Sequence, residues 1–208
     1  EYQIRNPRKK EYIDFLFSAL SLDEYFEPRK NYPELQYDRG HLFNTFLLLA
    51  ECHELSLREI EQLLASINLT LRTAKENEYI YPALLTFLVV TKNLNPDQYQ
   101  QYISDSESEV GTIEYLYRIV PEKKRIGNFE CALIEGFLIA AKNNRYQPGE
   151  LNSLIRHKEI LTNPDLTKDV KYYSEMVMHV VDRPVGFGGS VTLETLVKRI
   201  DFLSQFVF

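Results

Sequence analysis

The chain has 208 residues, a length that suits one large domain or two small ones with a buried hydrophobic core. Apolar residues make up 44% and charged residues 26%, as in ordinary soluble globular proteins. The formal net charge of −6 argues against a protein whose main task is to coat nucleic acid or an anionic membrane.

The two cysteines, Cys52 and Cys131, lie far apart in the sequence. A secreted disulfide scaffold carries more cysteines, so we interpret them as free buried thiols of a cytoplasmic protein, with one disulfide as the alternative. The polar start, EYQIRNPRKK, is unlike a signal peptide, and apolar runs such as YIYPALLTFLVV are shorter than the roughly 20 residues of a membrane-spanning helix. Because the chain does not begin with Met, we expect it to be part of a longer protein.

Helical periodicity recurs through the first half of the chain, and strand alternation is almost absent. A helix is expected from Pro7, since proline is tolerated at a first helical position. Another is expected from Pro82, and a shorter one is capped and started by Asn95-Pro96. The predicted helices of this half cover about 7–20, 42–50, 57–71, 82–93 and 96–103.

In the second half, Asn128 is expected to cap the most hydrophobic helix, and Thr167 and Thr192 to precede two further helices. The predicted helices there cover about 111–120, 129–144, 151–161, 168–181 and 193–206. The fold class is therefore all-α, an array of about nine or ten helices with no substantial sheet. The acidic stretch SDSESE, residues 104–109, is the candidate boundary between regions 1–104 and 105–208.

Signals for catalysis and metal binding are weak in this sequence. The glycines of VGFGGSV lack the lysine and the preceding strand of a P-loop, so a flexible loop is the preferred interpretation. No HExxH or CxxC motif is present, and adjacent helical residues such as Cys52 and His53 diverge by about 100°. The sequence contains no recognisable arrangement of a nucleophile, a base and an orienting group for nucleophilic catalysis. We therefore predict neither catalytic residues nor metal ligands.

Two basic clusters, at 8–10 and 123–125, are the only features of the sequence that suggest binding to an anionic polymer such as nucleic acid. Tyr115 and Tyr117 precede the second cluster, an arrangement that could serve a nucleic-acid contact. Three charges give only a modest electrostatic attraction, so we prefer a solvated turn in this acidic chain.

Arg58 is the single residue for which a site is proposed. Ser56 and Glu59 are spaced as a capping box, which places Arg58 in the first turn of a helix, where the backbone already forms a positive end. One interpretation is a surface arginine that tolerates a penalty of about 0.3–1 kcal/mol. The other is an anion site made by the guanidinium and the free N–H groups of the helix start. The sequence favours neither.

The ordered segments LSLREIEQLLASINLTLRT and YPALLTFLVVTKNLNPDQYQQY resemble the helical part that follows the nucleotide-binding core in KAP-family P-loop NTPases. YQIRNPRKKEYIDFLFSAL looks like the passage where the chain of these proteins leaves the last core strand. The resemblance covers about residues 1–104. Nothing in residues 105–208 resembles a known family.

The resemblance implies a helical lid beside an ATP-binding core, with Arg58 at the position from which related NTPases contact the γ-phosphate. For the full-length protein it implies ATP and Mg²⁺ as cofactors and a P-loop core N-terminal to this chain. Proteins of this family are often encoded by phages, plasmids and defence loci.

The printed sequence contains neither GxxxxGK[ST] nor an apolar strand ending in acidic residues, so this chain alone is not expected to hydrolyse ATP. The first hypothesis is a non-catalytic nucleotide-sensing fragment that relays the bound state to a protein partner. The alternative is a self-contained helical interaction module in which Arg58 is only structural.

Overall fold

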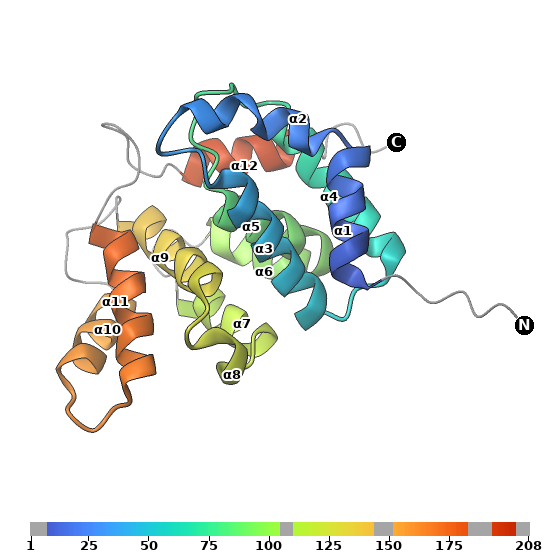
Figure 1. Cartoon of the computed structure of the whole chain (residues 1–208). Coiled ribbons are helices and arrows are strands. Elements are labelled where there is room, and N and C mark those ends of the chain that lie inside the picture. Colours follow the sequence, from blue (N-terminus) through green and yellow to red (C-terminus); the bar gives the residue numbers. More distant parts are fainter. Residues whose placement is uncertain (1–7, 105–109, 144–151, 183–192, 203–208) are drawn as a thin grey trace, which may run out of the picture.

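The computed structural model describes residues 8–104, 110–143, 152–182 and 193–202 (Figure 1). These residues form twelve α-helices and one 3₁₀-helix and contain no strand, which confirms the all-α prediction. The elements are α1 (Lys9–Ala19), α2 (Leu22–Phe26), η1 (Pro28–Asn31), α3 (Asp38–Cys52), α4 (Leu57–Leu71), α5 (Pro82–Leu94), α6 (Pro96–Ser104), α7 (Val110–Ile119), α8 (Glu122–Arg125), α9 (Phe129–Asn143), α10 (Asn152–Thr162), α11 (Lys168–Asp182) and α12 (Leu193–Phe202).

Helix starts agree with the capping residues in the sequence. Ser56 and Glu59 form the complete capping box of α4. The side-chain oxygen of Asn128 accepts the backbone N–H of Cys131 at 3.1 Å, as expected of an N-cap. Helices α5 and α6 begin at Pro82 and Pro96, as predicted. Local chemistry therefore sets these boundaries.

The short elements α2, η1 and α8 were not predicted. Each has five residues or fewer, too short for a 3.6-residue apolar period to show in the sequence. The first of them starts after Ser21, which adopts a left-handed conformation with φ 53°. Helix α1 begins at Lys9, whereas the start expected at Pro7 lies outside the described residues, as does Thr192 before α12.

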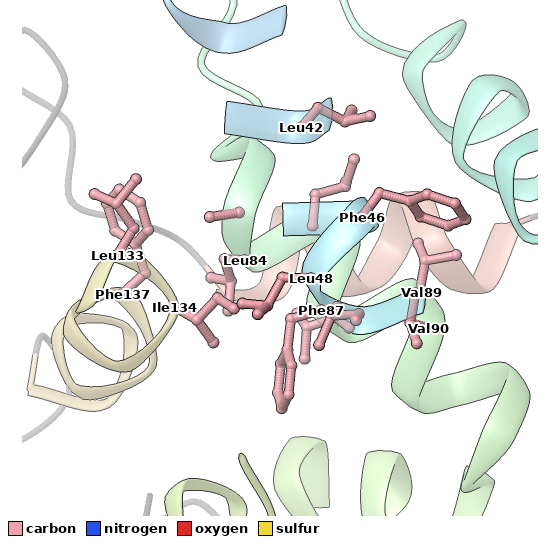
Figure 2. Close-up of a cluster of buried hydrophobic side chains, with 14 of the residues drawn as sticks. Leu42, Phe46, Leu48, Leu84, Phe87, Val89, Val90, Leu133, Ile134 and Phe137 are labelled. Atoms are coloured by element: carbon pink, nitrogen blue, oxygen red, sulfur yellow. The ribbon is translucent and has the colours of Figure 1, made fainter. Parts of the chain in front are cut away.

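The hydrophobic core centres on α5, which is packed between α3 and α9. All residues from Pro82 to Thr91 are buried, so α5 is enclosed on every side instead of presenting one apolar stripe. Figure 2 shows side chains from the three helices meeting in this core: Leu42, Phe46 and Leu48 of α3, Leu84, Phe87, Val89 and Val90 of α5, and Leu133, Ile134 and Phe137 of α9.

One hydrophobic cluster runs from Ile13 in α1 to Ile200 in α12. Polar contacts also join the two halves of the chain: Lys92 of α5 donates to Asp201 of α12 at 2.7 Å. The expected boundary at 104–109 falls mostly on residues 105–109, outside the described part of the chain. In Figure 1, α9, α10 and α11 lie together at one side of the molecule, with α9 packed against α3 and α5.

Helices α9 and α11 approach each other very closely at Gly136. A Cβ atom built on this glycine would lie 2.6 Å from the Cβ of Val180 and 3.1 Å from the carbonyl oxygen of Val177. Real Cβ atoms essentially never make a contact this short. The absence of a side chain at Gly136 therefore sets the distance between the two helices.

Candidate functional site

Arg58 lies in the first turn of α4, with its side chain exposed to solvent. Its guanidinium makes no hydrogen bond or ion pair with any residue that the structure describes. The backbone N–H groups of Leu57 and Arg58 likewise have no acceptor there. An exposed cation and two N–H groups without an acceptor among the described residues thus lie together at the start of α4.

The capping box explains how α4 tolerates a cation in its first turn. The backbone N–H of Ser56 donates to Oε2 of Glu59 at 2.8 Å, and the N–H of Glu59 donates to Oγ of Ser56 at 3.3 Å. The hydrogen bonds from Ser56 hold the pKa of the Glu59 carboxyl below its usual range. The carboxylate that favours a helix N-terminus is therefore present beside Arg58 and offsets the dipole penalty.

A second helix N-terminus lies at the same end of the molecule. Figure 1 shows α1 and α4 side by side, and the two helices are in contact. Lys9, the first residue of α1, donates its ammonium group to the carbonyl oxygen of Ala50 at 3.1 Å, near the end of α3. Its charge also contributes to the low pKa of Glu59, so Lys9 lies close to the start of α4. Arg58 is one of several charged groups at this end.

A buried ion pair that the sequence did not indicate fixes the loop before α5. Arg29 is completely buried and donates to Oδ2 of Asp38 through Nε at 3.1 Å and Nη2 at 2.5 Å. It also donates to three backbone carbonyls of the α4–α5 connection: Lys75 and Glu76 from Nη1, and Glu78 from Nη2. Burial raises the pKa of the Asp38 carboxyl, and the Arg29 charge opposes that rise.

A cavity of about 190 Å³ opens beside this ion pair, where the start of α3, the start of α5 and one face of α9 meet. Its walls combine carboxylates with aromatic rings and small apolar groups. The lining residues are Glu34, Asp38, His41, Tyr79, Tyr81, Pro82, Ala83, Leu133 and Phe137.

The aromatic part of the wall is held by specific contacts. The rings of Tyr79 and Tyr81 are stacked with centroids 6.1 Å apart, and the Phe137 ring meets Tyr81 edge-on at 5.5 Å. Tyr81 has a φ of 47° immediately before Pro82, an uncommon conformation for a residue with a large side chain. His41 Nδ1 lies 3.3 Å from both carboxylate oxygens of Glu130, so α9 fixes the imidazole.

A second buried polar network joins α7, α9, α10 and α11. Glu135 is 1% exposed and accepts hydrogen bonds from Tyr117, from His157 Nε2 at 2.9 Å and from Tyr173 at 2.6 Å. Because Nε2 donates to the carboxylate, Nδ1 of a neutral ring accepts from Ser174 at 3.0 Å.

Burial raises the pKa of Glu135, but the hydrogen bonds and the His157 interaction outweigh it and leave the pKa below its usual range. The order Ser174–His157–Glu135 has the form of a catalytic triad. However, Ser174 and His157 are each only 1% exposed, so neither side chain is accessible to a substrate in solution. We therefore interpret this network as structural.

The remaining sequence candidates do not converge on a site. Cys52 and Cys131 are free thiols, and burial raises the pKa of Cys131 to about 12. In the basic cluster, Arg125 lies over the Tyr117 ring at 3.5 Å, while Lys124 is 3.7 Å from Glu51. Among the described residues, no group of three or more His, Cys, Asp or Glu side chains could hold a metal ion, and no helix could span a membrane. The glycine-rich stretch VGFGGSV lies outside the described part of the chain.

No family model, curated protein or solved structure matches this chain.

Proposed function

We propose that this chain is the non-catalytic helical lid and sensor region of a KAP-like P-loop ATPase, in which Arg58 meets the γ-phosphate of ATP held by an N-terminal P-loop core. The observation that supports this proposal is that Arg58 is exposed and unpaired beside two unpaired N–H groups at the start of α4. Had the guanidinium been buried in an internal ion pair, it could not reach a ligand on another domain.

A γ-phosphate at this position would explain a cation in a helix first turn. The phosphate would accept from the guanidinium and from the backbone N–H groups of Leu57 and Arg58, and the helix dipole would favour its charge. ADP lacks this group, so hydrolysis would remove the contact and release the lid. The cytoplasmic location, which the two cysteines suggest, and the phage- or defence-related role, which the resemblance implies, belong to the same proposal.

The sensor role is tested in the protein that carries both the P-loop core and this chain. Arg58→Ala is expected to weaken ATP binding by about 1.5–3 kcal/mol, the value of a hydrogen bond to a charged group, and to leave ADP binding nearly unchanged. The rate of ATP hydrolysis should also decrease in this variant, while circular dichroism should show an unchanged fold. Lys168→Ala, which removes another exposed cation without an ion-pair partner among the described residues, at the first residue of α11, is the matched control. Equal ATP affinity and turnover in wild type and Arg58→Ala would contradict the proposal.

The second candidate is a self-contained helical module that binds a protein partner. It is favoured by large apolar side chains exposed on the second-half helices, among them Ile155 on α10 at 44% and Tyr172 on α11 at 58%. Aromatic and aliphatic groups of this size are typical anchors of protein interfaces. Under this hypothesis, Arg58→Ala changes neither nucleotide binding nor partner binding. This result would distinguish the interaction module from the nucleotide sensor.

A further inference from the structure

We propose that the cavity between α3, α5 and α9 binds the ammonium end of a lysine side chain presented by a partner polypeptide. This inference does not depend on Arg58 or on nucleotide binding, and it involves a different face of the chain.

The size of the cavity limits the ligand to the end of a side chain. At about 190 Å³ it offers the space of about six water molecules at ~30 Å³ each. Pockets that enclose drug-sized ligands are larger, about 300–1,000 Å³. A nucleotide or an extended peptide segment therefore does not fit inside, whereas the last carbons and the nitrogen of a lysine do.

The charges of the lining favour a cation. Two carboxylates, Glu34 and Asp38, line the cavity, and the described residues of its wall include neither lysine nor arginine. Glu34 is exposed and has no ion-pair partner among the described residues. Arg29 balances the charge of Asp38, so the uncompensated negative charge of the lining is that of Glu34, which attracts a positive group.

Asp38 supplies an unused acceptor inside the protein. The residue is only 6% exposed, and both hydrogen bonds from Arg29 go to Oδ2. Oδ1 accepts no hydrogen bond from any described residue. Because one oxygen is already occupied, the carboxylate cannot receive the two parallel bonds of a second guanidinium. A single ammonium point charge matches the one free oxygen better than arginine does.

The aromatic wall suits the same ligand. Tyr79, Tyr81 and Phe137 place three rings around the cavity, and ring faces attract cations. The rings also cover the methylene carbons next to a lysine nitrogen. Carboxylates and aromatic rings in one small cavity thus fit an alkylammonium group better than a neutral apolar group or an anion.

The rim indicates that a polypeptide carries this lysine. Tyr37 is 65% exposed and Phe129 is 47% exposed, and each ring lies next to the imidazole of His41, which lines the cavity. Large exposed rings around a pocket are typical of protein interfaces, because they gain contact area when a partner covers them. A free amine would leave both rings in water.

The test uses the whole chain labelled with ¹⁵N and two short peptides that differ at one position, lysine or norleucine, so that only the ammonium group distinguishes them. We expect the lysine peptide to shift the amide resonances of Asp38, His41 and Ala83, and the norleucine peptide to leave them unchanged. Glu34→Gln should weaken lysine-peptide binding by about two- to five-fold, the range for a partly exposed ion pair. Because Glu34 is exposed, this variant should fold normally.

Glu61→Gln, an exposed glutamate on α4 that does not line the cavity, is the matched control and should bind as wild type does. Equal shifts with both peptides, no shift at these residues, or equal weakening by the two glutamate variants would overturn the proposal. A titration with n-butylamine separates the two sources of an ammonium group. If it produces the shifts and the lysine peptide does not, the assignment to a polypeptide partner is wrong.

Discussion

Replacing Gly136 by alanine tests the closest helix contact of the fold. The new Cβ would lie 2.6 Å from Cβ and 2.7 Å from Cγ1 of Val180, whereas carbon atoms normally pack at about 3.5–4.0 Å. Helices α9 and α11 would have to separate by about 1 Å, because the β-branched Val180 has one strongly preferred rotamer in a helix and cannot turn away.

The expected free energy follows from two opposing effects. Overpacking of this kind costs about 1–3 kcal/mol, and the upper end applies because a backbone carbonyl also lies at 3.1 Å. Alanine regains about 1 kcal/mol over glycine in a helix. The net destabilisation is therefore about 2 kcal/mol, equivalent to about 4–8 °C in Tm for a chain of this size.

The assay is urea unfolding followed by far-ultraviolet circular dichroism. Gly40→Ala in α3 is the matched control, because no atom lies within 4 Å of its added Cβ, and it should stabilise the protein by about 0.5–1 kcal/mol. If both variants change stability by the same amount and in the same direction, α9 and α11 do not approach each other as closely as described. Val180→Ala should relieve part of the Gly136→Ala cost, a coupling measured by a double-mutant cycle.

Two further predictions concern the buried charges. Arg29→Met should lower the free energy of unfolding by about 3–5 kcal/mol in the same urea assay, because Asp38 and three carbonyls lose their buried partner; a change below 1 kcal/mol would contradict this. Glu135→Gln should cost about 1–3 kcal/mol at pH 7. Because the pKa of Glu135 is lowered in the folded state, its stabilisation is present above the usual value of 4.5 and is lost as pH falls through the folded pKa. The stability difference between wild type and Glu135→Gln should therefore narrow on acidification, and a constant difference down to pH 3 would refute the assignment.

The sequence correctly predicted those features of the fold that depend on residues close to one another in the chain. The capping box of Ser56 and Glu59 was correct because both partners lie within one helical turn. The start of α5 at Pro82 was correct because proline fixes its own backbone angle. The short helices α2 and α8 were missed, since an element of five residues or fewer shows no period and forms where packing requires it.

For the candidate sites the sequence was less informative. Arg58 could be singled out because a cation in a helix first turn conflicts with a local rule. Glu135 also breaks a pattern, as a charge within the apolar run FECALIEGFLIAA, and that signal could have identified a buried polar network. Nothing local indicated that Arg29 would be completely buried, because its carbonyl partners lie 46 to 49 residues away.

The sequence by itself determined that this chain is helical and where most of its helices begin, because periodicity and capping act over three or four residues. The tertiary structure alone decided which polar groups are buried together and where a cavity remains. The wall of that cavity combines Glu34 and Asp38 with Tyr81 and Phe137, which come from three separate parts of the chain. Such a grouping depends on how the helices pack, and no spacing within one segment encodes it.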